Sequence, residues 1–262
     1  MTYRNSTLAL LVLAAGLAGC DQLSDGGNAL PHMYNGDQAM KGARYEYAAS
    51  EYAIALKDNP GNPVNSNALG RALMALNRPA DAVEYLRTAV NQEPQNAQYT
   101  DDLCDALVKA GRTEEMFRLL RGNADNRGGT DDWLRLGAWA MRVGDPDVSK
   151  TALMTAARVD KGTHVAPQFA LHKLYSSLGD RGNAEMRLRT AYYVDPHDSD
   201  VIARMKTLKV VSGPTFPLRP PEMDIEPTIR PEPSQVGRPD SEMKSRPATT
   251  PNPKEVNPNA GG

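Results

Sequence analysis

Apolar residues between positions 63 and 96 recur at the three- and four-residue spacing that is typical of an amphipathic α-helix. They do so in two short runs, each of which places its apolar side chains on one helix face. Asn77 and Arg78 interrupt the pattern, and Pro79 stands where the first turn of a helix tolerates a residue without an N–H group. The pattern predicts two short helices packed back to back. Neither helix could bury its apolar stripe alone, so we expect further units of the same kind.

Residues of the same kind recur 34 positions apart along this part of the chain. The matching pairs are Gly36 and Gly70, Ala48 and Ala82, Tyr52 and Leu86, Ala55 and Ala89, and Pro60 and Pro94. Small residues at the helix crossings and a proline at the end of the unit resemble the tetratricopeptide repeat, a helix–turn–helix unit. The resemblance implies an all-α chain that forms a right-handed solenoid.

The repeat extends to five units, which we expect at residues 29–62, 63–96, 97–129, 130–163 and 165–198. The third unit is irregular, because Asn123 stands where a small crossing residue belongs. Its last segment, 123–129, lacks the usual proline and is interpreted either as a bend or disordered linkage, or as a longer surface loop. Cys104 falls in frame with the crossing glycines, and we expect it to be a buried, inert thiol.

After the fifth unit, the sequence predicts one more amphipathic helix over 199–211, which would cover the last apolar face of the solenoid. Its apolar side is expected to hold Val201, Ile202, Met205, Leu208 and Val211. We therefore assign the solenoid and its capping helix to residues 32–211. The segment 212–262 contains twelve of the chain's twenty prolines, which predicts a disordered tail. This tail is either a solvated segment or a tether or docking peptide, and residues 216–220 could fold back onto the last helix.

The first twenty residues predict an export signal rather than part of the fold. Arg4 precedes an apolar run, 8–17, that is too short to span a bilayer comfortably. The run ends in Leu-Ala-Gly-Cys, which resembles the bacterial lipobox. The resemblance implies a signal peptide at 1–19 and a covalent lipid on Cys20 that anchors the chain to a membrane of the cell envelope. Residues 21–31 are polar and contain glycine, so we expect the acylated cysteine and a flexible tether at 20–31. An ordinary cleaved signal is the alternative, and Asp21 leaves the choice between inner and outer membrane open.

Composition and motifs narrow the functional class. A net charge of −2 argues against nucleic acid as a partner, since such proteins are normally basic. The four histidines fall in different units, and no nucleophile motif, metal-ligand spacing or phosphate-binding glycine loop is present, so we expect neither an enzyme nor a bound metal or cofactor. Asp101, Asp102 and Asp105 form an acidic cluster that could share a cation or bind a basic partner. Its simpler interpretation is a solvated first helical turn, which favours carboxylates.

In proteins with tetratricopeptide repeats, the first helix of each unit lines a concave groove. The resemblance therefore implies partner-binding roles for Asn67, Arg71, Met74, Asp101, Asp105, Lys109, Met141, Arg142 and Lys173. The hypothesis is a non-enzymatic scaffold, lipid-anchored in the bacterial cell envelope, whose groove holds a segment of another envelope protein and assists the assembly or tethering of a complex. The alternative is a passive spacer whose proline-rich tail is the active end.

Overall fold

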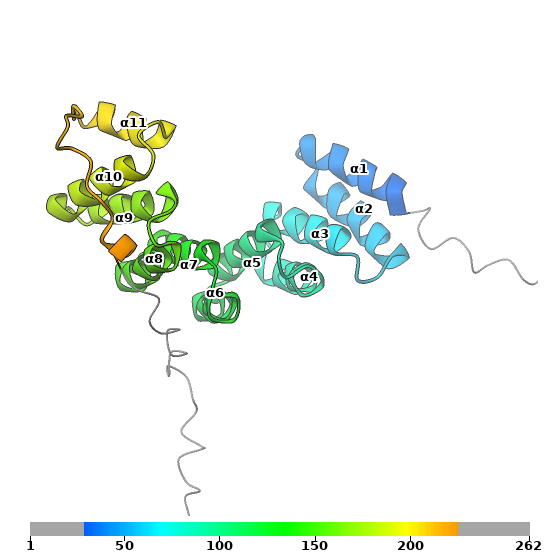
Figure 1. Ribbon diagram of the computed structural model, residues 1–262. Coiled ribbons are helices and arrows are strands. Elements are labelled where there is room, and N and C mark those ends of the chain that lie inside the picture. The colour runs from blue at the N-terminus through cyan, green and yellow to red at the C-terminus, as the bar shows by residue number, and fades with distance from the viewer. Residues whose placement is uncertain (1–28, 225–262) are drawn as a thin grey trace, which may run out of the picture. The chain divides into compact units, whose positions relative to one another are not determined.

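The computed structural model describes residues 29–224, and within that range the chain is entirely helical. The eleven α-helices there are α1 (Ala29–Lys41), α2 (Tyr45–Asp58), α3 (Pro63–Ala75), α4 (Pro79–Gln92), α5 (Ala97–Lys109), α6 (Thr113–Arg127), α7 (Thr130–Val143), α8 (Pro146–Asp160), α9 (Val165–Ser177), α10 (Arg181–Val194) and α11 (Ser199–Thr207). A 3₁₀ turn, η1 (Pro221–Asp224), follows them. Figure 1 shows the helices arranged as successive pairs in chain order. The predicted all-α chain of five helix pairs and one further helix is confirmed. The eleven helices belong to one compact unit that ends at Met223.

Close crossings between the two helices of a pair depend on the glycines that the repeat predicted. A Cβ atom built on Gly70 would lie 2.5 Å from Cγ of Leu86, and one built on Gly137 would lie 2.5 Å from Cδ2 of Leu153. No real side chain tolerates such a distance, so the absence of a Cβ is what lets α3 approach α4 and α7 approach α8. In the third unit this position holds Cys104, which is fully buried. The pair α5 and α6 accordingly packs less extensively than the other four pairs.

The fifth unit places a large residue at the same position. His172 is the eighth residue of α9, as Gly70 is the eighth residue of α3, and its side chain is 1% exposed. Its Nδ1 lies 2.7 Å from the carbonyl oxygen of Ala184 on α10. Its Nε2 lies 2.9 Å from Nε of Arg204 on α11. The imidazole therefore bridges the two helices at the position where three of the other pairs meet over a glycine, and it also binds the last helix.

The helix α11 covers the end of the last helix pair. Val201 and Met205 are buried against Phe169 and Leu188, which confirms the prediction of a helix packed on the fifth unit. The helix ends at Thr207, before the predicted limit of 211, and Lys209 has a positive φ of 54°. Leu208 and Val211 were predicted to pack on the fifth unit with the rest of the apolar side of this helix. That prediction was wrong, since Leu208 is 45% exposed and Val211 is 87% exposed.

Three segment boundaries differ from those expected. The helix α1 begins at Ala29, inside the segment 20–31 that was expected to be a flexible tether. The segment 123–129 is mostly helical, because α6 continues to Arg127 with Ala124 buried, and the helix ends at Gly128 in the left-handed conformation. Residues 212–224 pack against the solenoid rather than beginning a tail. The expected signal peptide, Cys20 and the tail from 225 onward lie outside the described residues.

Residues 212–224, which end with η1 and which we call the strap, pack along α10. Arg189 donates hydrogen bonds to the carbonyl oxygens of Thr215 (2.9 Å) and Phe216 (2.8 Å), and the Phe216 ring packs edge-on against Tyr192. The amide of Leu218 donates to the carbonyl oxygen of Arg189 at 3.3 Å. Residues 216–220 thus fold back as expected, but the hydrogen bonds and the ring contact of this segment are with α10 rather than with the last helix. No described helix is long and apolar enough to cross a membrane.

Candidate functional site

Five of the nine residues expected to bind a partner form polar contacts with other side chains of this chain, mostly across successive first helices. The Asn67 amide on α3 donates a hydrogen bond to Asp102 on α5 at 2.9 Å. The Trp139 indole on α7 donates to Asp101 on α5 at 2.8 Å, and Arg135 forms an ion pair with the same carboxylate at 3.4 Å. These bonds join side chains that lie one repeat apart, so they hold neighbouring repeats in register.

The same arrangement continues along α5. Asp105 pairs with Lys109 at 2.8 Å on its own helix and with Arg142 on α7 at 3.0 Å. The Arg142 guanidinium also lies over the ring of Trp139, 4.5 Å from the centroid. Asp101 and Asp105 are therefore each neutralised by cationic side chains of this chain. Among residues 29–224 no group of three or more histidine, cysteine or acidic side chains is arranged to hold a metal ion.

The remaining predicted residues have different surroundings. Arg71 is exposed on α3, whereas Met74 is half-buried and packs against the core. Asn67 is 6% exposed, so its side chain is committed to Asp102 rather than to the surface. Met141 and Lys173 of the predicted set line the same cavity. The structure thus gathers two of the nine predicted groove residues at one hollow site.

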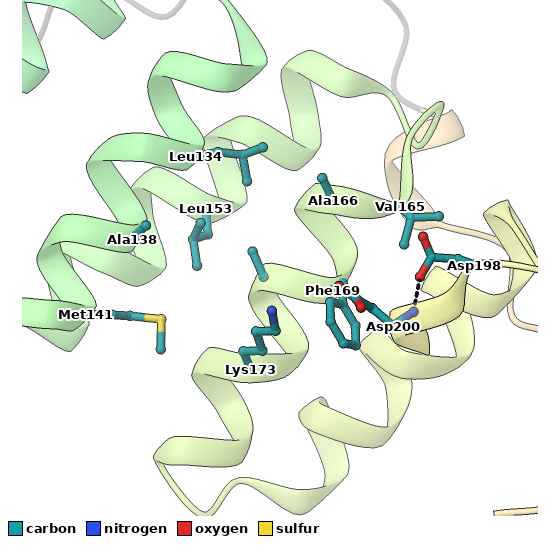
Figure 2. A pocket seen from close by; sticks show the side chains of 11 residues that line it. Leu134, Ala138, Met141, Leu153, Val165, Ala166, Phe169, Lys173, Asp198 and Asp200 are labelled. Atoms are coloured by element: carbon teal, nitrogen blue, oxygen red, sulfur yellow. Dashed lines mark hydrogen bonds between the residues drawn. The ribbon is translucent and has the colours of Figure 1, made fainter. Parts of the chain in front are cut away.

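This cavity, which we call the α7–α9–α11 pocket, lies between the first helices of the fourth and fifth units and the start of the last helix. Its volume is about 370 Å³. Leu134, Ala138 and Met141 of α7 form one wall, and the buried Leu153 of α8 lies at the bottom. Figure 2 shows these side chains pointing toward the face of α9 on the opposite side. The pocket therefore has an apolar interior.

The helix α9 supplies the second wall, with Ala166 and Ala170 as its small residues and Phe169 as its large one. The Nζ atom of Lys173 lies 4.5 Å from the centroid of the Phe169 ring. That contact is a cation–π interaction, which holds an ammonium group beside a ring without neutralising it. Within residues 29–224 Lys173 forms no ion pair with a carboxylate, so its charge remains available at the pocket.

The first turn of α11 completes the pocket with two carboxylates. Asp198 caps the helix, since its Oδ1 accepts hydrogen bonds from the amides of Asp200 (3.0 Å) and Val201 (2.9 Å). Asp200 is exposed, and its carboxylate has no cationic partner among the described residues. In Figure 2, Phe169 lies between Lys173 on one side and Asp200 on the other. The pocket thus carries opposite charges on two sides of an apolar centre.

Phe169, Asp198 and Asp200 were not assigned to a site from the sequence, because the last helix was interpreted only as a cap. One signal was available. If the helix at 199–207 occupies the place of a sixth first helix, its first turn must face the groove beside α9, and an acidic first turn then becomes part of the concave surface. The polar contacts that join α3 to α5 and α5 to α7, which we call the ladder, could also have been predicted from the sequence. The complementary side chains that form them recur about one repeat apart.

A second hollow, of about 560 Å³, lies between α2 and α4. Its floor consists of Leu69 and Leu73, which are each only 5–6% exposed. Its charged residues Arg78 and Asp81 pair with each other at 2.6 Å. Because the polar groups there are largely satisfied internally, the α7–α9–α11 pocket is the better candidate site.

Cys104 has no place in this site. The residue is fully buried at the crossing of α5 with α6, and burial raises the pKa of its thiol, with the nearby Asp101 carboxylate acting in the same direction. A raised thiol pKa removes the thiolate that nucleophilic or metal-binding cysteines require. The expectation of a buried thiol is confirmed, and its chemistry is that of a small apolar side chain.

Part of the chain matches a known sequence family. A family model described as tetratricopeptide repeat matches residues 39–101, which cover α2 to α4 and parts of the flanking helices. No curated protein matches the chain.

Several solved structures are similar. The MamA protein is 20% identical, with 72% of this chain and 100% of that one covered and a TM-score of 0.47. TTC0263, a thermophilic tetratricopeptide protein of Thermus thermophilus, is 22% identical over 70% and 100%, with a TM-score of 0.44. PilF of Pseudomonas aeruginosa is 15% identical over 71% and 86%, with a TM-score of 0.46. Over residues 39–101, this chain is thus similar in sequence to tetratricopeptide repeat proteins.

Proposed function

We propose that this chain is a non-enzymatic scaffold that binds a segment of another protein in the α7–α9–α11 pocket. Tetratricopeptide repeats generally mediate protein–protein interaction, and residues 39–101 match that family. The pocket itself carries the proposal. It is concave and apolar, and it is edged by charged side chains that have no ionic partner in the described part of the chain.

The other concave surfaces explain why the site is confined to this end of the solenoid. Between α3, α5 and α7, the polar side chains are joined in the ladder that runs from Asn67 to Arg142. A partner that bound there would have to break these contacts, and exposed ion pairs offer little net free energy in exchange. At the α7–α9–α11 pocket, by contrast, binding would remove apolar surface from water without breaking an ion pair.

We further propose that the chain is a lipoprotein of the bacterial cell envelope, where it assists the assembly or tethering of an envelope complex. The support is the Leu-Ala-Gly-Cys sequence at residues 17–20 after an apolar run. Acylation of Cys20 with more than one chain would anchor the protein stably, whereas a single acyl chain gives only marginal binding. Labelled palmitate should be incorporated into the wild-type chain and not into Cys20→Ser, which should leave the membrane fraction. Retention of Cys20→Ser in the membrane would contradict the anchor.

The binding site is tested by photo-crosslinking in intact bacteria. A benzophenone amino acid is placed at Ala138 or Ala166, which are exposed and line the pocket. The matched control is Glu185, which is exposed on α10 and does not line it. Discrete adducts from both pocket positions and none from Glu185 are the expected result. Equal adducts at all three positions, or none at the pocket, would contradict the proposal.

A further inference from the structure

The α7–α9–α11 pocket is positively charged on one side and negatively charged on the other, and this asymmetry indicates which partner sequence it binds. We propose that its occupant is an extended segment of a partner protein in which one apolar side chain lies between an acidic residue and a basic residue. The acidic residue would face Lys173, and the basic residue would face Asp198 and Asp200. This inference rests on the proposed function and adds the chemistry of the partner to it.

The size of the pocket supports a side chain as the buried group. Its volume of about 370 Å³ lies at the lower end of the range for ligand sites, about 300–1,000 Å³. The surfaces that face it belong to Leu134, Met141 and Phe169, and Leu153 is only 1% exposed at its base. An apolar side chain gains free energy there by leaving water, whereas a polar one would lose its hydrogen bonds.

The walls favour an extended backbone. Ala138, Ala166 and Ala170 line the two sides of the pocket, and at these positions the partner's main chain can approach α7 and α9 closely. In an extended chain, neighbouring side chains point in opposite directions and residues two apart share a face. An apolar side chain can therefore enter the pocket while the charged residues two positions before and two positions after it reach the two sides of the pocket.

Electrostatic complementarity selects those charged residues. The Lys173 ammonium is held at 4.5 Å over the Phe169 ring, and that contact leaves its charge uncompensated. On the other side of Phe169, the Asp198 and Asp200 carboxylates occupy the first turn of α11, and the hydrogen bonds that Asp198 accepts come from backbone amides rather than from a cation. A partner with charges of the wrong sign would place like charges beside each other. The charges on the two sides of the pocket thus determine which partner sequence is preferred, and burial of the partner's apolar side chain supplies affinity.

The test uses the full-length chain in mild detergent and five short capped peptides as probes. Each probe varies three residues at alternate positions, separated by single alanines, so that all three side chains share one face of the extended chain. Named by these variable residues in order, the probes are Asp-Leu-Arg, Asp-Leu-Asp, Arg-Leu-Arg, Ser-Leu-Ser and Asp-Gly-Arg. Binding is followed by NMR of ¹³C-labelled methionine methyl groups. Met141 lines the pocket and reports binding, while the buried Met116 on α6 serves as the internal reference. The Met141 signal is assigned with Met141→Leu.

We expect Asp-Leu-Arg to shift the Met141 signal saturably, with affinity at least about threefold higher than that of any other probe, as one exposed ion pair provides. In Lys173→Glu the preference should change to Arg-Leu-Arg. In Asp200→Lys the advantage of Asp-Leu-Arg over Asp-Leu-Asp should disappear. Arg158→Glu, which makes the same change in net charge at an exposed position of α8, should behave like the wild type.

The outcomes separate the two proposals. If all leucine peptides bind equally and Lys173→Glu changes nothing, the charge pattern is wrong, although crosslinking from Ala138 would still support a binding site. If no peptide moves the Met141 signal while Ala138 and Ala166 give adducts, the partner is not an extended segment of this kind, and the inference is again wrong. Absence of adducts together with absence of peptide binding would overturn both proposals.

Discussion

The guanidinium of Arg187 lies 2.6 Å from the carboxylate of Glu222, and both side chains are more than nine-tenths shielded from solvent. Arg187 belongs to α10 and Glu222 to the strap, 35 residues later in the chain. Gln168 of α9 joins the same cluster, since its Oε1 accepts from Arg187 at 2.8 Å and its amide donates to Glu222 at 3.2 Å. The strap is thus fastened by a buried polar network, beside the apolar cluster that contains Phe169 and Phe216.

Removing one partner of this ion pair should destabilise the chain more than removing both. Glu222→Ala leaves the Arg187 cation buried without its carboxylate, and an uncompensated buried charge costs about 3–5 kcal/mol. The double variant Arg187→Met with Glu222→Leu removes both charges and should recover most of that loss. The free energy of unfolding is measured by urea denaturation. Glu185→Ala, an exposed carboxylate on the same helix, is the control, and a loss no larger than in this control would show that the strap is not held as described.

Gly70 should not accept even one methyl group. A Cβ at this position would lie 2.5 and 2.6 Å from two carbons of Leu86, so Gly70→Ala forces α3 away from α4 or moves a fully buried leucine. Such overpacking costs about 1–3 kcal/mol. Gly122 lies inside α6 with nothing within 4 Å of the point that a Cβ would occupy, so Gly122→Ala should be neutral or stabilise the chain by up to about 1 kcal/mol. Thermal unfolding of the two variants measures both effects. Equal shifts in Tm would refute the steric reason for the glycine.

The repeat was predictable because its signals are local. Apolar spacing along one helix and small residues 34 positions apart reflect contacts inside one helix pair, so the glycines at 36, 70 and 137 already indicated the crossings. The segment 123–129 was misjudged for the same reason. Its missing proline suggested an interruption, but burial of Ala124 in continuity with Leu120 keeps α6 helical to Arg127.

The pocket and the strap were less predictable, because each depends on residues far apart in sequence. In the sequence, Glu222 is one more charged residue in a proline-rich segment. Its role follows only from the structure, in which Arg187 of α10 and Gln168 of α9 lie beside it. The acidic first turn of α11 resembles any capped helix start, and it becomes a pocket wall only when the helix lies beside α9. The same held for Asp101, which looked free for a partner and is paired with Arg135 one repeat away.

Cys104 should be unreactive in the folded chain. Burial raises the pKa of its thiol, and only the thiolate attacks alkylating reagents. In a Cys20→Ser background, iodoacetamide at pH 8 should leave Cys104 unmodified in buffer and modify it completely in concentrated urea. Mass spectrometry of the intact chain gives the modified fraction. Rapid modification under native conditions would mean that α5 and α6 open readily at their crossing.

His172 should make the stability of the chain depend on pH. Burial lowers the pKa of this imidazole below the usual 6.5, and the nearby Arg204 and Lys173 cations act in the same direction, against the opposing hydrogen bond to the Ala184 carbonyl. The geometry agrees with a neutral ring, since Nε2 accepts a hydrogen bond from Arg204 while Nδ1 donates to Ala184. Protonation would turn the Nε2 acceptor into a donor that faces a guanidinium.

The direction of the effect follows from proton linkage. The unfolded chain binds a proton at His172 more readily than the folded chain, so the stabilisation is complete above about pH 6.5 and is lost as the pH falls below that value toward the lower folded pKa. We therefore expect the free energy of unfolding of the wild type to fall more steeply between pH 7 and pH 5 than that of His172→Gln. His197→Gln removes an exposed histidine and should keep the wild-type slope. If His172→Gln and the wild type lose stability in parallel, the imidazole does not hold α11 to the fifth helix pair through its neutral form.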